Sequence, residues 1–211
     1  MITQRLAHVY WLGGGSGAGK STIARRLAET YGLGLYPTDD AMTDHAGRTN
    51  AEDSPYLAQF VAMDMDQRWL NRSPEAMLET FHWFRGEGFD LIVEDLLHHS
   101  TDRGVIVEGF RVLPELVRPL LAVPEQAVWL LPTPEFRQAA FVHRGSLWAI
   151  AGGTSDPHRA LANLLERDRR FTEHLADEVK RLDLRAIEVD QTMTEDDLAV
   201  RVATSFGLST R

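Results

Sequence analysis

The stretch of the sequence with the clearest chemistry reads GGSGAGKS, from residue 14 to residue 21. It matches G-x-x-x-x-G-K-[ST], the pattern of loops that bind phosphate groups. Glycines let the backbone amides turn inward around an anion, and the helix that follows adds the positive end of its dipole. Lys20 can then reach the β- and γ-phosphates of a nucleotide, and the Ser21 hydroxyl can ligate the magnesium ion between them.

We therefore expect this loop to bind ATP together with Mg²⁺, although the pattern does not distinguish ATP from GTP. The residues expected to bind the nucleotide are Gly14, Gly15, Ser16, Gly17, Ala18, Gly19, Lys20, Ser21 and Thr22. The alternative is a glycine-rich turn before an ordinary helix. The pattern favours the phosphate site because an apolar run precedes it and helical spacing follows it.

A pair of carboxylates, Asp39 and Asp40, follows an apolar run at residues 33–36 that predicts a short strand. In a parallel sheet, the loop after this strand opens on the same edge as the phosphate loop. An aspartate there can accept a proton from a hydroxyl oxygen that attacks phosphorus. We expect Asp39 to be this base and Asp40 to be the second choice. The alternative is that the pair caps the next helix.

Arginines gather between residues 136 and 170, whereas the chain as a whole is acidic. Arginine suits the negative charge that spreads over the equatorial oxygens during phosphoryl transfer. The glycines within residues 150–159 supply the break that a closing lid needs. We expect at least one of Arg144, Arg167 and Arg170 to contact phosphate, the alternative being that these arginines pair with neighbouring carboxylates.

The elements that would position these residues follow from the apolar patterning. Apolar runs predict strands near residues 8–12, 33–36, 104–110, 126–134 and 184–190, and helical spacing predicts helices over 21–31, 54–70, 73–88 and 89–99. Strands that alternate with helices predict an α/β fold, with a parallel sheet of about five strands covered by helices on both faces.

The phosphate loop in its strand–loop–helix setting resembles the P-loop kinases of the nucleoside and nucleotide kinase group. The resemblance implies a doubly wound parallel sheet with the nucleotide at the carboxyl ends of the strands. It also implies one domain over residues 1–211, with a helical acceptor region at 41–99 and a lid at 136–170. The stretch YPTDDAM resembles the place where uridine kinases and chloramphenicol phosphotransferase carry an aspartate that faces the acceptor hydroxyl.

The stretch VIVEGFR, residues 105–111, resembles the third-strand motif of adenylate kinases, in which an Asp-Gly pair precedes an arginine that binds the acceptor. The resemblance implies that Glu108 holds the magnesium through water and that Arg111 binds the acceptor. Glutamate stands here in place of the aspartate, and the proline before the arginine is missing. Glu94 and Asp95 are competing candidates for the magnesium.

The region at residues 41–99 also carries aromatic side chains at largely helical spacings, which favours a role in the core over a stacking surface. They are Tyr56, Phe60, Trp69, Phe81, Trp83 and Phe84. The acceptor stays open between a nucleoside, a sugar and an antibiotic-like alcohol, because the side-chain directions in these helices do not follow from one sequence.

Composition and charge narrow the classes of function. The chain has 211 residues, of which 44% are hydrophobic and 25% charged, as in soluble globular proteins. A formal net charge of -9 disfavours a nucleic-acid partner. There is no cysteine, and neither a signal peptide nor a membrane-spanning run is recognisable. We expect a cytoplasmic monomer or homodimer whose partners are a nucleotide and a small molecule.

These observations predict an ATP-dependent kinase that transfers the γ-phosphate to a hydroxyl group of a small molecule. The alternatives are a nucleotide-dependent switch that controls a partner and a binding module with an inactive kinase site. The sequence contains neither an N-K-x-D guanine-binding motif nor the L-S-G-G-Q signature of transporter ATPases. Asp39 and Asp40 argue against the inactive site, since they provide a usable base.

Overall fold

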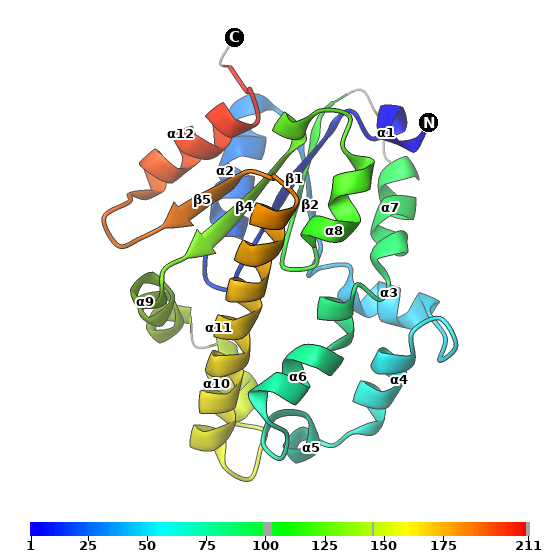
Figure 1. Ribbon diagram of the computed structural model, residues 1–211, viewed down its shortest axis with the longest axis vertical. Coiled ribbons are helices and arrows are strands. Elements are labelled where there is room, and N and C mark those ends of the chain that lie inside the picture. Colours follow the sequence, from blue (N-terminus) through cyan, green and yellow to red (C-terminus); the bar gives the residue numbers. More distant parts are fainter. Residues whose placement is uncertain (99–102, 145, 210–211) are drawn as a thin grey trace.

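The computed structural model describes residues 1–98, 103–144 and 146–209, without the side chains of residues 138, 141–144 and 146–147 (Figure 1). Within these ranges the chain forms a five-stranded sheet in the order β2-β3-β1-β4-β5, and every neighbouring pair is parallel. The strands are β1 (Val9–Gly14), β2 (Gly34–Pro37), β3 (Val105–Glu108), β4 (Ala127–Pro132) and β5 (Ala186–Val189). The predicted fold class is confirmed.

Apart from the short α1 (Ile2–Arg5), which precedes β1 and has no buried residue, the helices of the described ranges fall into three groups. Those packed on the sheet are α2 (Lys20–Tyr31), α7 (Phe89–His98), α8 (Pro114–Val117), α11 (Pro157–Arg181) and α12 (Glu195–Ser205), with 3-10 turns η2 (Arg118–Leu120) and η3 (Pro124–Gln126). Those of the acceptor region are α3 (Met42–Arg48), α4 (Pro55–Ala62), α5 (Met65–Trp69), α6 (Pro74–Thr80) and η1 (His82–Arg85). Those before α11 are α9 (Pro134–Arg144) and α10 (Ser146–Ala151).

The sheet is buried on both faces, as its apolar strands predict. Leu12 of β1 packs in a cluster with side chains of α2 and α12 on one face. Trp11 of β1 and Trp129 of β4 pack on the other face with Leu6, which follows α1, and with side chains of α7, α8 and α11. The rigid sheet therefore carries, at its carboxyl edge, the loops that follow β1, β2 and β3.

The strand register aligns these three loops. Leu12 of β1 and Pro37 of β2 both lie level with Glu108, the last residue of β3. The phosphate loop, the segment after Pro37 and the Glu108 side chain therefore leave the sheet at nearly the same height. This is the geometric basis of the site described below.

Residues 42–85, here called the helical lobe, lie beyond this edge of the sheet (Figure 1). The predicted single helix over residues 54–70 is wrong, because the chain breaks between α4 and α5. Asp64 caps α5 by accepting a hydrogen bond from the Gln67 backbone amide, while the Gln67 side chain accepts one from the Asp64 amide. The predicted helix over residues 73–88 likewise ends at Thr80 and continues as η1.

The expected lid is attached to the helical lobe. The loop between α10 and α11 carries Ser155, whose backbone amide donates to Asp66 of the lobe at 2.7 Å. Asn163 of α11 donates to the Leu70 carbonyl at 3.1 Å. Figure 1 shows α11 running from this end of the molecule to the sheet, so that one 25-residue helix borders both.

None of the helices in the described ranges combines the length and the hydropathy that crossing a membrane requires.

Candidate active site

The phosphate loop connects β1 to α2, and its course requires glycine. Gly14 has a φ of +133°, and a Cβ there would lie 2.1 Å from the Leu130 carbonyl oxygen. Gly19 precedes α2, whose first turn contains neither a capping side chain nor an acidic residue. Lys20 folds back over the loop and donates from Nζ to the Gly15 carbonyl at 2.8 Å. The loop thus presents an ammonium group and a helix N-terminus to an anion.

Asp39 lies opposite this loop, on the wall of the same cavity as Lys20. Its position depends on close packing between the ends of β2 and β3, since a Cβ at Gly109 would lie 1.8 Å from the Thr38 hydroxyl oxygen. The surrounding protein strips hydration from the Asp39 carboxyl and raises its pKa, while Lys20 acts in the opposite direction. A raised pKa makes this carboxylate a better proton acceptor near neutral pH. Asp40 is outside the cavity lining.

Glu108 ends β3 and also lines the cavity. The Ser21 hydroxyl donates a hydrogen bond to its carboxylate, and burial, the larger effect, raises the pKa of Glu108. Mg²⁺ in nucleotide sites takes one or two protein oxygens of this kind and completes its shell with phosphates and water. The competing pair, Glu94 and Asp95, lies on α7 and pairs with Arg48 away from the cavity. The geometry therefore favours Glu108 and Ser21 as the magnesium ligands.

The loop, Asp39 and Glu108 form part of the wall of a cavity of about 390 Å³, a volume suited to a small molecule. Much of the remaining wall is aromatic and is here called the aromatic wall. It consists of Phe60, Trp69, Phe81, Trp83, Phe84 and Phe110. The expectation of a core role for the aromatic residues of this region was therefore incomplete, because only Tyr56 of that set is outside the lining.

Arg167 of α11 brings a charge into this cavity. The residue is 6% exposed, and its guanidinium lies 5.0 Å from the ring centre of Phe81 and 5.2 Å from that of Phe84. Nε and Nη2 both donate to Oδ1 of Asp168, at 2.9 and 2.6 Å. Among the described residues, neither Arg167 Nη1 nor Asp168 Oδ2 has a hydrogen-bond partner.

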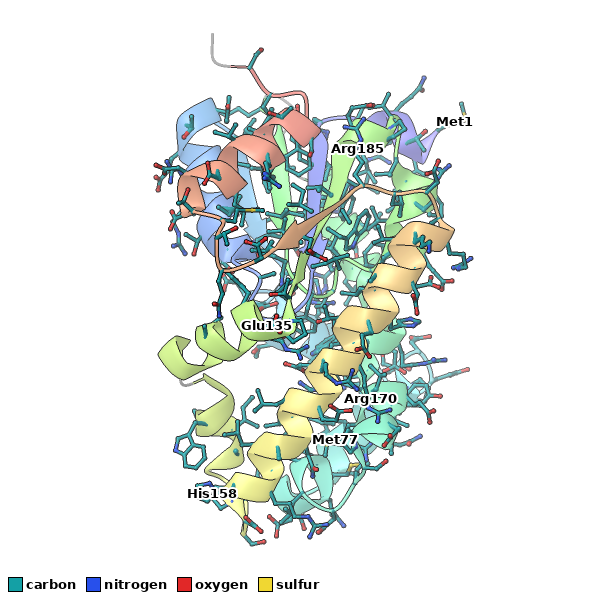
Figure 2. The ribbon with its side chains drawn as sticks, turned by 60° about the vertical axis from the view of Figure 1, so that its left-hand side comes forward. Met1, Met77, Glu135, His158, Arg170 and Arg185 are labelled. Atoms are coloured by element: carbon teal, nitrogen blue, oxygen red, sulfur yellow. The ribbon has the colours of Figure 1, made fainter. Side chains whose placement is uncertain are left out.

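The other two lid arginines are placed differently. Arg170 pairs with Glu75 of α6 at 2.6 Å and with Glu166 at 2.7 Å, and Figure 2 shows it on the side of α11 that faces the helical lobe. Arg169 also pairs with Glu166, so this part of the helix is self-paired, the alternative that the sequence left open. The side chain of Arg144 lies outside the described part of the structure.

Arg111 lies behind the cavity wall and is outside its lining. The residue is 2% exposed. Its guanidinium donates to the Gly88 carbonyl at 2.9 Å and to the Thr38 carbonyl at 3.4 Å, and it stacks 4.1 Å from the Trp83 ring centre. Burial lowers the pKa of Arg111 to about 10. This arrangement supports the backbone just before Asp39.

Sequence reasoning did not single out His82, Phe110 and Asp168, which line the cavity, or Arg137, which lies close to the phosphate loop. Arg137 lies on α9, and its Cγ would be 3.9 Å from a Cβ placed on Gly17 of the phosphate loop. Burial lowers the pKa of its guanidinium, and Asp168 acts in the opposite direction. The sequence signal was its place in the arginine-rich segment, but only the packing of α9 distinguishes it from the other arginines there.

Comparisons with known proteins bear on the same site. No protein-family model matches the chain. It is 56% identical over 122 residues to a protein named shikimate kinase from Mycobacterium marinum (strain ATCC BAA-535 / M), an alignment that covers 53% of this chain and 62% of the relative. It is 59% identical over 39 residues to another, from Rhodococcus jostii (strain RHA1), covering 18% of this chain and 23% of the relative.

The chain thus spans less than two thirds of the length of either curated relative. Among solved structures, an uncharacterized protein from Eubacterium ventriosum ATCC 27560 has a TM-score of 0.49 and 14% sequence identity, over 94% of this chain and 97% of that one. Both named relatives are kinases, and this chain is similar to each of them over part of its length.

Proposed function

We propose that this protein is an ATP-dependent kinase that phosphorylates a hydroxyl group of a small molecule. The observation that carries the proposal is that the phosphate loop and Asp39 line one cavity, which has room for a small acceptor. The similarity to two proteins named shikimate kinase supports the same reaction class.

In this proposal, the loop amides and Lys20 hold the phosphates of ATP. The acceptor hydroxyl attacks the γ-phosphorus, and Asp39 takes its proton as the new O–P bond forms. The bond to the oxygen between the β- and γ-phosphates breaks, and ADP leaves. Arg137, buried beside Gly17, adds positive charge at the phosphate end of the cavity.

Ser21 and Glu108 fit the role of magnesium ligands, because their hydrogen-bonded oxygens border the phosphate loop. When bound, Mg²⁺ neutralises phosphate charge. Arg111 acts on the backbone of Thr38 and is a positioning residue in this proposal.

The test is phosphoryl transfer from Mg²⁺-ATP to a panel of nucleosides, sugars, hydroxylated antibiotics and shikimate. Wild type is compared with Lys20→Ala and Asp39→Asn. We expect transfer to one class of acceptor, reduced about 100- to 1000-fold in Lys20→Ala, as for loss of a group that stabilises transition-state charge. Lys180→Ala is the matched control, because the chain has two lysines and Lys180 is exposed on α11.

Nucleotide binding without transfer to any acceptor would overturn the kinase proposal and favour the nucleotide-dependent switch. Transfer that Asp39→Asn leaves unchanged would overturn the assignment of the base while keeping the reaction class.

A further inference from the structure

The wall of the cavity away from the phosphate loop restricts which acceptors can bind. The six rings of the aromatic wall give that side of the cavity an apolar lining. Phe60 and Phe81 lie with ring centres 5.4 Å apart, and Phe84 and Phe110 lie 5.7 Å apart, each pair nearly perpendicular. Such a lining favours an aromatic ring over a polyol. The hydroxyl groups of a polyol would lose their hydrogen bonds to water and gain few hydrogen bonds from apolar side chains.

A donor and an acceptor accompany these rings. Arg167 Nη1 is a buried N–H donor, and Asp168 Oδ2 is a buried carboxylate oxygen. Both lack a hydrogen-bond partner within the described ranges, and both side chains line the cavity. Buried polar groups are nearly always paired in proteins. His82 also lines the cavity, and its Nδ1 likewise lacks a partner within the described ranges, so three such groups at one cavity point to a ligand that supplies the missing partners. That ligand needs both a hydrogen-bond acceptor and a hydrogen-bond donor.

The charged side chains of the lining argue against a carboxylate as the hydrogen-bonding group of the ligand. Arg167 and Asp168 neutralise each other at 2.6 Å. The remaining charged side chains of the lining are Lys20, Asp39 and Glu108, and the phosphates of ATP would engage Lys20. His82 also lines the cavity, and burial lowers its pKa to about 4, so it is uncharged at neutral pH. A carboxylate would satisfy Arg167 but would be repelled by Asp168.

We propose that the acceptor is an uncharged alcohol that carries an aromatic ring together with a hydrogen-bond donor and acceptor, as nucleosides and aromatic amido alcohols do. This inference rests on the proposed function, because the bound alcohol is a phosphate acceptor only if the protein is a kinase. It also names Arg167 and Asp168 as the pair that selects the acceptor, in place of the phosphate contact expected of Arg167.

The first experiment measures binding to the full-length protein without nucleotide, by quenching of tryptophan fluorescence, because Trp69 and Trp83 belong to the aromatic wall. The probes are uridine, thymidine, chloramphenicol, glucose and shikimate. Adenosine is left out, since it can enter the nucleotide site. We expect at least one of the first three to bind about tenfold or more tightly than glucose and shikimate, and tighter binding of either of those two would overturn the inference.

The second experiment isolates charge with a matched pair of probes, 4-(hydroxymethyl)benzamide and 4-(hydroxymethyl)benzoate. Both probes contain the aromatic ring and the alcohol, but the first carries an uncharged amide where the second carries a carboxylate. We expect wild type to prefer the amide by about tenfold or more, because the carboxylate meets Asp168. In Asp168→Asn this preference should fall to about threefold or less, because the charge of Arg167 is no longer compensated.

Asp177→Asn, an exposed position on the same helix, should keep the wild-type preference. If Asp168 has only a structural role, Asp168→Asn should weaken the binding of both probes equally and leave the ratio of their affinities unchanged. That result would overturn the role of Asp168 in selecting the acceptor. If Asp168→Asn does not fold, Phe81→Leu replaces it as the test variant. If Phe81→Leu binds uridine or chloramphenicol as tightly as wild type does, the proposal that the aromatic wall binds the acceptor ring is overturned.

The two proposals can fail separately. Aromatic binding with no phosphoryl transfer would support the chemistry assigned to the cavity and overturn the kinase. Transfer to shikimate or a sugar that requires Lys20 and Asp39 would support the kinase and overturn the acceptor class.

Discussion

Asp39 is the residue whose environment most directly predicts a pH dependence. Its pKa is raised, chiefly because the surrounding protein removes hydration, and only the ionised carboxylate can accept a proton. Activity should therefore rise with pH through a pKa above the usual aspartate value of about 3.9. The check is the pH profile of kcat/KM for wild type and Asp39→Asn. A profile whose acid limb survives in Asp39→Asn would show that another group is responsible.

Glu108 offers a second prediction, in which stability and activity change in opposite directions. Burial raises its pKa, so the folded protein binds a proton more tightly than the unfolded chain does. Its ionisation therefore costs stability, and that cost appears as pH rises from the ordinary glutamate pKa through the raised one. Glu108→Gln removes the charge and should raise the melting temperature at neutral pH while reducing transfer and its dependence on Mg²⁺. A lowered melting temperature together with full activity would contradict both roles.

At the scale of elements, β2 is tied to the helices beside it by one carboxylate. Asp95 of α7 accepts hydrogen bonds from the Tyr36 hydroxyl at 2.6 Å, from His45 Nε2 at 2.8 Å and from Arg48 at 2.8 Å. Tyr36 lies in β2, and the other two lie in α3. The segment that carries Asp39 connects β2 to α3, so this network holds both ends of that segment.

Asp95→Asn should lower the free energy of unfolding by about 2–3 kcal/mol, because it weakens three hydrogen bonds to the charged carboxylate of a side chain that is 25% exposed. Urea denaturation checks this value. Glu94→Gln is the matched control, since Glu94 contacts the same Arg48 but is 53% exposed. Exposed pairs of this kind contribute about 0–1 kcal/mol. If Asp95→Asn and Glu94→Gln lower the free energy of unfolding by the same amount, Asp95 does not stabilise the fold more than an exposed carboxylate does.

The same network predicts sensitivity to acid. Burial acts to raise the pKa of Asp95, but hydrogen bonds from Arg48, Tyr36 and His45 outweigh it and lower the pKa to about 2. A lowered pKa in the folded state gives stability that is present above the unfolded value of about 3.9 and lost as pH falls toward 2. Between pH 4 and 2, the stability difference between wild type and Asp95→Asn should therefore shrink, as measured by urea denaturation at each pH.

At the scale of the whole molecule, α11 connects the phosphate loop, the cavity and the helical lobe. Thr172 packs against Gly15 of the phosphate loop so closely that a Cβ on Gly15 would lie 2.4 Å from the threonine hydroxyl oxygen. Arg167 and Asp168, about one turn earlier, line the cavity, and Asn163 bonds to the helical lobe. A nucleotide held by the loop should therefore stabilise the sheet and the lobe together.

A ligand at 100 times its Kd stabilises the folded state by about 2.7 kcal/mol, which raises the Tm of a chain of this size by about 5–10 °C. We expect this shift with Mg²⁺ and a non-hydrolysable ATP analogue, measured by differential scanning calorimetry. Lys20→Ala should lose most of the shift, and Lys180→Ala should keep it. A full shift in Lys20→Ala would mean that the nucleotide binds elsewhere.

Local signals in the sequence were sufficient for the fold class and for much of the phosphate end of the site. The apolar runs and the glycine pattern are read within short windows, because strand burial and the left-handed backbone at Gly14 depend on neighbouring residues. The same local reasoning predicted Asp39 as the base, since parallel strands expose their carboxyl ends on one edge. The prediction for Glu108 came instead from the resemblance of residues 105–111 to the adenylate kinase motif. It failed at the break between α4 and α5, where the Asp64 capping box ends the longer apolar pattern.

The tertiary structure determines which side chains line the cavity away from the phosphate loop. Phe60, Phe84 and Phe110 come from three separate segments, and their spacings alone did not show that they share a cavity with the phosphate loop. Arg167 and Arg170 are three residues apart on one helix, yet one lines the cavity and the other pairs with α6. Which face of a helix meets which neighbour depends on contacts between residues far apart in the chain. The sequence by itself therefore determined the fold class and predicted a phosphate-binding loop, whereas long-range packing decided which side chains share the cavity with that loop.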